Sequence, residues 1–285
     1  MLRYRRYFFV VVALCTIASA ALGALSDGVI TVLTFNDETA DDITGRNDGI
    51  LRGGAGFAPG KHGLGLDVNG VDAYVEIPDD KSMDAMADEF THAAWAFIRK
   101  SSDHGAVIFK GEKIGWGPNF HIRMGTLNDT DLTYGSNNVK GAVDKKPERG
   151  AANPEGWFNV RGSYKLDTWI HMAQVGNGKT IQGFLNGKPA HVTDGFHGAA
   201  GRDPMTLTAP YATFPGFPIL VGASRGRGND VNNWEYIDGI IDDVVIFGRA
   251  LSAVEIEKLS RLDLEALTVE PKDKLATTWA AIKFD

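Results

Sequence analysis

The amino-acid sequence predicts an all-β fold, in which two antiparallel sheets pack face to face as a jelly-roll β-sandwich and a short helix lies near the C-terminus. Most of the chain consists of short apolar or alternating runs separated by Gly, Asn and Asp turns, which is typical of sandwiches and jelly rolls. Two Asn-Gly pairs each join one run to the next, and Asn-Gly accepts the positive φ angles of a tight hairpin. The sequence lacks the alternating strand and helix units of a doubly wound α/β fold.

The predicted strands follow one another from residue 28 to residue 247. The clearest stretch is residues 169–192, where Asn177-Gly178 and Asn186-Gly187 join three runs into a meander. In residues 120–124 apolar and polar side chains alternate, which indicates a strand with one buried face. The predicted strands are residues 28–35, 73–77, 93–98, 107–109, 120–124, 169–175, 180–185, 188–192, 219–223 and 237–247.

One segment is predicted to be helical. Ser252 precedes residues 253–262, and Glu255 follows three residues after Ser252, which is the pattern of a capping box. The tail, residues 263–285, is expected to dock on the domain. Its apolar side chains are Leu275, Trp279 and Ile282.

Residues 128–162 have a weaker strand pattern and are rich in Asn, Gly, Lys and Pro. A structureless loop of that length is uncommon in a compact domain. We therefore expect strands near residues 132–134 and 157–161, with a long surface loop between them.

Residues 1–24 are predicted to be a secretory signal peptide. Three arginines near the start precede the apolar run of residues 8–17, and small residues dominate residues 18–24. Cleavage is expected after Ala20 or Ala24, which makes the mature protein secreted or periplasmic, without stable membrane insertion. A retained N-terminal anchor is the alternative.

The composition excludes several kinds of site and partner. Cys15 is the only cysteine and lies in the predicted signal peptide, so thiol nucleophiles, thiolate zinc sites and iron–sulfur clusters are excluded from the mature chain. The chain has 29 basic and 36 acidic residues and a net charge of −7. A chain this acidic lacks the cationic surface that a phosphate backbone needs, so we expect no nucleic-acid partner.

Five segments carry the motifs of one domain family. They are Phe35-Asn36-Asp37-Glu38 with residues 42–49, Gly60-Lys61-His62-Gly63 with residues 66–70 and 72–75, residues 168–173, residues 184–188, and Ile241-Asp242-Asp243-Val244 with residues 249–252 and Glu255-Ile256. In this order they resemble laminin G-like (LamG-like) domains, which are jelly rolls of the concanavalin A-like lectin/glucanase superfamily. The resemblance implies a single domain over residues 25–262. Residues 128–162 depart from the compact family pattern and are a place for a specialised loop.

The resemblance also implies a calcium ion, because related domains often hold one where the first and last strands meet. Calcium prefers oxygen ligands from carboxylates, amides and carbonyls. Asp37, Asn47 and Asp48 lie in two successive loops after the first strand, and Asp242 and Asp243 lie on the last strand. Since side chains alternate along a strand, Asp242 and Asp243 are expected on opposite faces of the sheet. The alternative is that the loop residues only form turns and that both aspartates reach solvent.

Three tryptophans are candidate ligand contacts. Trp116, Trp157 and Trp234 lie in loop-like surroundings, where an indole ring can cover the apolar face of a sugar. Burial against the edge of the sandwich is the alternative for each. Trp95 and Trp169 lie inside apolar strands and are expected in the core.

The familiar catalytic patterns do not occur in the sequence. The glucanase branch of the superfamily places its acids as Glu-x-Asp-x-Glu on one strand face, and this spacing is missing. His171 is interpreted as a structural residue. We therefore expect a non-catalytic module that binds extracellular glycan or glycoprotein with the help of calcium. A protein–protein adhesion or scaffold module is the alternative, and a glycoside hydrolase is the third choice.

Overall fold

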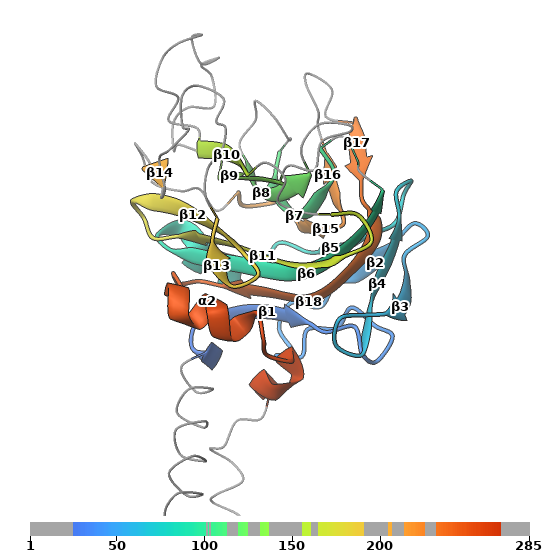
Figure 1. Cartoon of the computed structure of the whole chain (residues 1–285), viewed down its shortest axis with the longest axis horizontal. Coiled ribbons are helices and arrows are strands. Elements are labelled where there is room, and N and C mark those ends of the chain that lie inside the picture. Colours follow the sequence, from blue (N-terminus) through green and yellow to red (C-terminus); the bar gives the residue numbers. More distant parts are fainter. Residues whose placement is uncertain are drawn as a thin grey trace, which may run out of the picture.

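A computed structural model confirms the all-β sandwich (Figure 1). It describes residues 25–100, 102, 104–112, 119–124, 132–136, 156–160, 165–190, 205–206, 214–225 and 232–268. The predicted signal peptide and most of the predicted tail lie outside these residues. Within them, no helix has both the length and the apolar character needed to cross a membrane.

Two large antiparallel sheets, which we call sheet A and sheet B, form the sandwich, and β16 (Ala223–Arg225) pairs with β17 (Trp234–Tyr236) beside them. Three short helical segments are η1 (Lys81–Ala87), α2 (Ala253–Leu259) and η2 (Leu264–Thr268). Sheet A has the order β13 (Lys188–Pro189), β12 (Thr180–Leu185), β11 (Trp169–Gly176), β6 (Phe90–Lys100), β18 (Asp238–Phe247), β4 (Leu64–Asn69) and β3 (Gly56–Pro59), with β1 (Val29–Leu33) beside β18 and β14 (Met205–Thr206) beside β12. Sheet B has the order β10 (Gly156–Val160), β9 (Leu132–Ser136), β8 (Asn119–Met124), β7 (Ala106–Gly111), β15 (Ile219–Val221), β5 (Tyr74–Ile77) and β2 (Ile50–Arg52).

The main core fills the space between the two sheets. Every second residue of β6, for example Ala94 and Ile98, points into it from sheet A. Val75 and Ile77 of β5 point into it from sheet B. Because side chains alternate across a strand, the residues between these positions lie on the outer faces of the sandwich.

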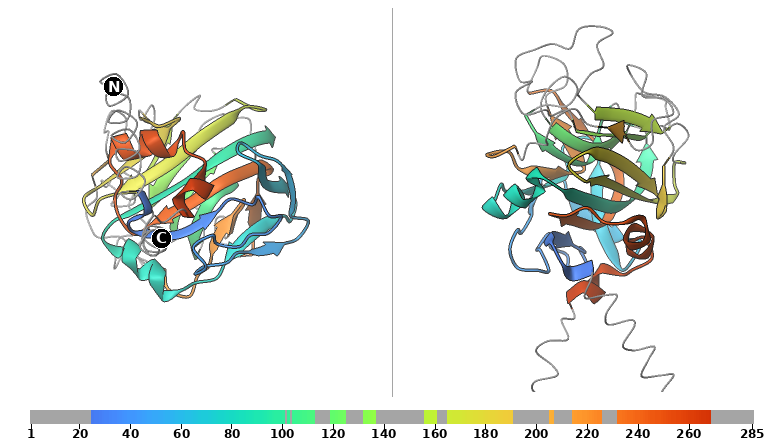
Figure 2. Two further views of the ribbon diagram at one scale, coloured as in Figure 1. Left: turned by 90° about the horizontal axis from the view of Figure 1, so that it is seen from below. Right: turned by 90° about the vertical axis from the view of Figure 1, so that its left-hand side faces the viewer.

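A second apolar cluster lies on the outer face of sheet A. The segments α2 and η2 lie against this face and cover part of it (Figures 1 and 2). Ile256 and Leu259 of α2 pack there on Ala93 and Phe247 of the sheet. The predicted capping box at the start of α2 is confirmed, with Ser252 as the N-cap. The helix ends at Leu259, three residues earlier than predicted.

The first and last strands of the fold are neighbours. β1 pairs antiparallel with β18, from Val29 opposite Phe247 to Leu33 opposite Val244. β18 also pairs with β6, and its register shifts between Asp242 and Val245, which marks a β-bulge. β18 therefore joins the two ends of the domain, as the calcium hypothesis requires.

Some local expectations are wrong. The short strands β2, β3 and β4 were not predicted, because runs of only three to six residues give little periodicity. Trp95 is buried as expected, although on the outer face of sheet A. Trp169 lies on the same face and is only half-buried, so the expectation that it belongs to the core is wrong. The period-two pattern shows which side chains of a strand share a face, but it does not show whether that face meets the other sheet or lies on the outside.

Candidate functional site

Trp234 lies in a cluster of aromatic rings on the outer face of sheet B. Trp234 and Tyr236 are two residues apart on β17 and so point the same way, and β5 contributes Tyr74. The ring centroid of Tyr74 lies 5.3 Å from that of Trp234 and 6.1 Å from that of Tyr236, and Trp234 and Tyr236 stack at 6.1 Å. Tyr74 and Trp234 pack on Phe109 and Leu220, apart from the main core. We call Tyr74, Trp234 and Tyr236 the aromatic cluster, and all three residues are half-buried.

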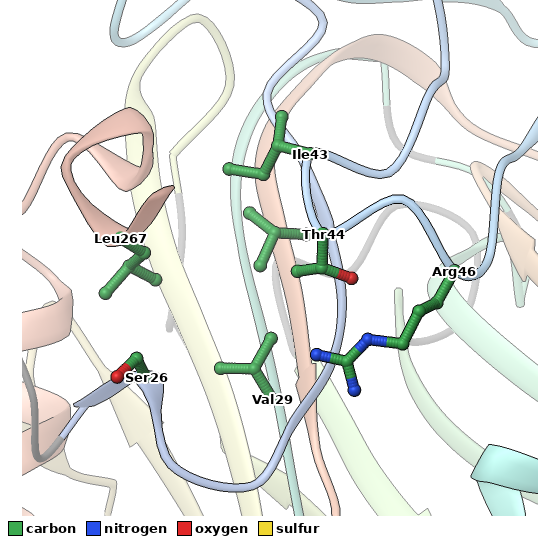
Figure 3. A pocket seen from close by; sticks show the side chains of 7 residues that line it. Ser26, Val29, Ile43, Thr44, Arg46 and Leu267 are labelled. Carbon is green, nitrogen blue, oxygen red and sulfur yellow. The ribbon is translucent and has the colours of Figure 1, made fainter. Parts of the chain in front are cut away.

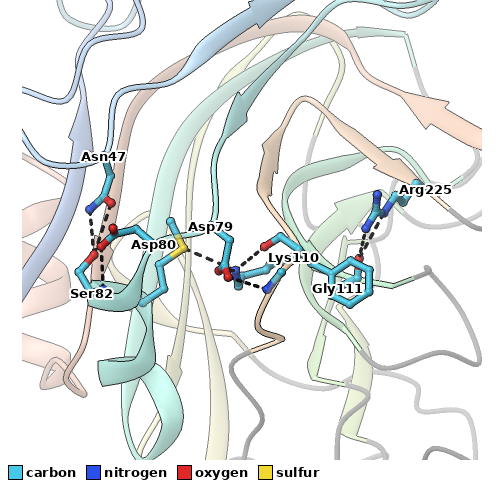
Figure 4. Close-up of polar contacts among 10 residues, drawn as sticks. Asn47, Asp79, Asp80, Ser82, Lys110, Gly111 and Arg225 are labelled. Atoms are coloured by element: carbon cyan, nitrogen blue, oxygen red, sulfur yellow. Dashed lines mark hydrogen bonds and ion pairs between the residues drawn. The ribbon is translucent and has the colours of Figure 1, made fainter.

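Polar groups surround the aromatic cluster. Burial raises the pKa of both tyrosine hydroxyls, so both remain hydrogen-bond donors at neutral pH. Arg52 pairs with Glu76 at 2.9 Å on the same face of the sheet. Arg225 donates from Nε and Nη2 to the carbonyl of Gly111, each at 3.3 Å (Figure 4). Its guanidinium lies over the ring of Phe217. The arrangement offers apolar ring surface for C–H groups and charged or hydroxyl groups for a polar ligand.

For the other two predicted tryptophans, the structure does not describe the side chains. Trp116 lies outside the described residues. Trp157 lies in β10, opposite Gly135 of β9, at the other edge of sheet B. Only its backbone is described, so the ligand contacts of Trp116 and Trp157 stay predictions.

Asp242 and Asp243 form a buried carboxylate pair at the end of β1. Asp242 Oδ2 accepts hydrogen bonds from the backbone N–H groups of Lys61 and His62, at 2.7 and 2.9 Å, and its Oδ1 accepts one from the N–H of Asp243 at 2.8 Å. Asp243 Oδ2 lies 2.5 Å from His62 Nδ1. Asp243 Oδ1 is buried without a hydrogen-bond partner among the described residues.

The expectation that Asp242 and Asp243 face opposite sides of the sheet is wrong. The bulge gives Asp243 a φ of 50°, a left-handed conformation that Asp adopts more readily than most residues. Both carboxylates consequently contact the turn at residues 60–63. Gly60 permits this approach, since a Cβ at this position would lie 2.5 Å from Asp242 Oδ2.

Burial raises the pKa of both Asp242 and Asp243 to about 7. Asp243 adds to the rise at Asp242, and the charge of Asp263 adds to the rise at Asp243. A pair of carboxylates this poorly solvated favours a proton or a cation as its neighbour.

The loop residues of the predicted metal set lie elsewhere, along β1. Asp37 and Asp48 are exposed, whereas Asn47 is buried. Asn47 Nδ2 donates to Ser82 Oγ at 3.2 Å (Figure 4), and Asp48 Oδ1 accepts from the N–H of Asp42 at 2.9 Å. Asn47 Nδ2 also donates to the carbonyl of Ile30 at 2.9 Å, and the N–H of Ile43 donates to the carbonyl of Val32 at 3.0 Å, so this loop is held against β1.

Asp42, which was not among the predicted ligands, organises this loop. Its two oxygens accept hydrogen bonds from the N–H groups of Val32, Thr44, Arg46 and Asn47 and from the hydroxyl of Thr44, at 2.7–3.4 Å. A buried carboxylate with five donors has little capacity left for a metal ion. Asp42 therefore acts as a structural anchor.

Domains of this kind often bind calcium, so the fit of the donors matters. Four of the five predicted ligands form two groups, with Asp242 and Asp243 in one and Asn47 and Asp48 in the other. Asp37 is exposed, and its Oδ1 accepts a hydrogen bond from Thr39 Oγ1 at 2.9 Å. Among the described residues, no three His, Cys, Asp or Glu side chains meet closely enough to hold a metal ion. The unpartnered oxygen of Asp243 is the feature that fits a cation best.

A pocket of about 230 Å³ lies beside β1 and η2 (Figure 3). It contains none of the predicted site residues. Its lining residues are Ser26, Val29, Val32, Ile43, Thr44, Arg46 and Leu267. The aromatic cluster lies on the outer face of sheet B and does not line this pocket.

The architecture defines the chain as a concanavalin A-like β-sandwich. Residues 69–257 match the Laminin_G_3 model of the concanavalin A-like lectin/glucanases superfamily, and the chain belongs to this family. No protein among the curated proteins matches the sequence.

Solved structures with the same fold include binding domains. Domain 4 of AbnA, an extracellular arabinanase from Geobacillus stearothermophilus in complex with arabinotriose, is 18% identical, with a TM-score of 0.58, and the match covers 81% of this chain and 98% of that one. The binding domain of botulinum neurotoxin DC in complex with SialylT is 16% identical, with a TM-score of 0.56. The same domain in complex with rat synaptotagmin II is 15% identical, also with a TM-score of 0.56. Both neurotoxin matches cover 83% of this chain and 52% of that one, so the present chain spans about half of those structures. At these identities, the likeness concerns the fold.

Sequence reasoning missed Tyr74, Tyr236 and His62 as site residues. Tyr236 could have been found, because its spacing from Trp234 places both rings on one face of a strand. Tyr74 and His62 had no such signal, since their partners in space lie more than 150 residues away in the sequence.

Proposed function

We propose that this chain is an exported, non-catalytic recognition module that binds extracellular glycan or glycoprotein. The observation that carries the proposal is the aromatic cluster on the outer face of sheet B, with polar and charged side chains beside it. Sugars present both an apolar C–H face and hydroxyl groups, and the cluster offers a complement to each. The fold likeness to an arabinanase domain solved with arabinotriose and to a neurotoxin domain solved with SialylT supports the same ligand class.

The ligand test is a glycan array probed with the mature chain and with Trp234→Ala. We expect the wild-type chain to bind a defined set of glycans and Trp234→Ala to lose at least tenfold in affinity for them, roughly the effect of removing a central aromatic contact. Val254→Ala is the matched control, because Val254 is an exposed aliphatic residue on α2. Equal binding by wild type and Trp234→Ala would remove the aromatic cluster as the site.

Trp116 and Trp157 belong to the same test. Each is proposed as a further ligand contact, and each alanine variant is expected to weaken binding to the glycans that Trp234 recognises. A variant with unchanged binding takes that tryptophan out of the site.

Calcium is the second part of the proposal, with Asp242 and Asp243 as its main ligands. The loop residues Asp37, Asn47 and Asp48 are proposed as further donors, which requires Asn47 and Asp48 to leave the hydrogen bonds described above. The ion would neutralise the carboxylate pair and hold β18 against the turn at residues 60–63. A ligand that binds only the native state raises stability, by about 2.7 kcal/mol at a concentration one hundred times its dissociation constant.

The calcium test is a set of melting curves with calcium and with chelator. We expect millimolar calcium to raise the melting temperature of the wild-type chain and to have a much smaller effect on Asp243→Ala. Asp37→Ala tests the exposed loop donor separately, and a calcium effect equal to that of the wild-type chain would remove Asp37 from the ligands. An unchanged melting temperature of the wild-type chain would remove calcium from the proposal.

A protein–protein adhesion module is the second candidate. The complex of the botulinum neurotoxin DC binding domain with rat synaptotagmin II favours this candidate, because that domain has a similar fold and was solved with a protein partner. Binding to a deglycosylated protein partner, together with a silent glycan array, would support this candidate over the first.

A further inference from the structure

One half of the outer face of sheet A lies beyond α2 and η2. In the left view of Figure 2 the two helices cover one end of the sheet, and β11, β6 and β18 extend past them. The covered half is apolar and belongs to the second apolar cluster. The half that extends past the helices carries Phe97, Trp169 and Ile240, and all three side chains are half-buried. Large aromatic side chains on an outer sheet face call for an explanation beyond core packing.

Three neighbouring strands place these side chains in one row. Phe97 of β6 lies opposite Trp169 of β11 on one side and opposite Ile240 of β18 on the other. The ring centroids of Phe97 and Trp169 are 5.7 Å apart, with 54° between the ring planes. At the usual spacing of neighbouring strands the row spans about 10 Å. We call Phe97, Trp169 and Ile240 the outer row.

Fixed charges border the outer row. Arg99, two residues after Phe97 on the same face of β6, binds Asp238 Oδ1 through Nε at 2.8 Å and Asp67 Oδ1 through Nη1 at 2.7 Å. Its Nη2 donates to the carbonyl of Val68 at 2.6 Å. The side chains of Arg99, Asp67 and Asp238 remain 32–40% exposed. Three contacts hold the guanidinium in one orientation, so this charged group is preorganised and still reaches solvent.

The combination fits a carbohydrate. An apolar aromatic row covers the C–H face of a sugar ring, and exposed carboxylates beside it accept hydrogen bonds from hydroxyl groups. A surface for a hydrophobic protein partner would not require three charged side chains locked at its border. We infer that the outer row with Arg99, Asp67 and Asp238 is a second carbohydrate-binding face, separate from the aromatic cluster.

The inference takes its ligand class from the proposed function but uses a different site. The aromatic cluster lies on the outer face of sheet B, and the outer row lies on the outer face of sheet A. The two faces are on opposite sides of the sandwich, so one ligand cannot contact both. A single chain with two such faces binds two glycans at once and can connect two glycan chains.

Binding stoichiometry tests this directly. The probes are the oligosaccharides that bind the wild-type chain on a glycan array of neutral and sialylated members, each then titrated in a calorimeter. We expect two ligands per wild-type chain and one per chain for Trp169→Ala, because removal of a large aromatic contact weakens a site by about tenfold or more. Trp234→Ala is expected to retain one ligand as well, at the other face.

Additional variants keep the result independent of folding. Phe97→Ala and Asp238→Asn are expected to weaken the same binding event as Trp169→Ala, and circular dichroism checks each fold. Val254→Ala, an exposed residue on the same side of the molecule, is expected to bind two ligands.

The outcomes separate the two proposals. One ligand per wild-type chain, lost in Trp234→Ala and unchanged in Trp169→Ala, overturns the second face and leaves the proposed function standing. Binding lost in Trp169→Ala and unchanged in Trp234→Ala supports the outer row and overturns the aromatic cluster as the site. Failure of the wild-type chain to bind any glycan on the array overturns both.

Discussion

Lowering the pH should destabilise the folded chain in part through His171, and this part of the loss should be absent in His171→Leu. His171 is buried on the outer face of sheet A, with its ring centroid 5.3 Å from that of Trp95. Its Nδ1 has no hydrogen-bond partner within the described part of the chain. Burial lowers the pKa of His171 from 6.5 to about 3, so the folded chain keeps a neutral imidazole at mildly acidic pH.

The sign and size of the effect follow from linkage. Between about pH 6.5 and about pH 3 the unfolded chain binds a proton at this histidine and the folded chain does not, so stability falls as the pH falls. At about pH 5 the pH lies about 1.5 units below the pKa of the histidine in the unfolded chain, so protonation stabilises the unfolded state. The free energy of unfolding consequently falls by about 2 kcal/mol. His92, buried between the sheets with a pKa lowered to about 4, contributes a similar loss.

The assay is urea unfolding of wild type and His171→Leu at about pH 7.5 and about pH 5. The buried carboxyls Asp242 and Asp243, whose pKa values are raised, have the opposite pH dependence, because their contribution is lost as the pH rises through about 7. They act equally in both chains, so the difference in unfolding free energy between the two chains isolates His171. This difference should change by about 2 kcal/mol between the two pH values. The same difference at both pH values would show that the folded chain protonates His171 readily, against the reasoning from burial.

Three further predictions concern stability. Asp42→Ala should lower the unfolding free energy by about 3–4 kcal/mol in urea titrations, because it leaves buried N–H groups of the loop without an acceptor; a loss below about 1 kcal/mol would contradict its role as an anchor. Lys110→Met should cost about 2–4 kcal/mol in the same assay, since the fully buried ammonium contacts Asp79, and the double variant with Asp79→Asn should recover part of the loss. Ser252→Ala should cost about 1 kcal/mol by removing the capping box with Glu255, and thermal melts that show no change would argue that packing alone fixes α2.

The sequence predicted the parts of the fold that depend on neighbouring residues. Asn177-Gly178 and Asn186-Gly187 form the turns of the meander as expected, with positive φ at Gly178, Asn186 and Gly187. The capping box at Ser252 is likewise a contact between residues three apart. Such features involve a few adjacent φ and ψ angles and hydrogen bonds over short sequence distances, so the local sequence specifies them.

The candidate sites depend on contacts between distant segments. Trp234 could be predicted as a ligand contact from its surroundings, but its packing on Tyr74 requires β5 and β17 to meet. In the same way, Asp243 was identified as a carboxylate, but the bulge that turns it toward His62 arises from the pairing of β18 with β6. The alternation that predicted opposite faces for Asp242 and Asp243 holds only while a strand stays regular.

The sequence by itself determined that this protein is an all-β sandwich with a capped helix near its end, because period-two patterns, tight turns and caps are local properties. The LamG-like type followed from the resemblance of its motif segments to that family. Only the tertiary structure decided which aromatic residues are buried between the sheets and which lie on an outer face. That choice depends on where α2 and η2 pack, since they cover one half of sheet A and leave Phe97 and Trp169 half-buried on the other. A strand pattern specifies two faces, and the rest of the fold determines which of them meets solvent.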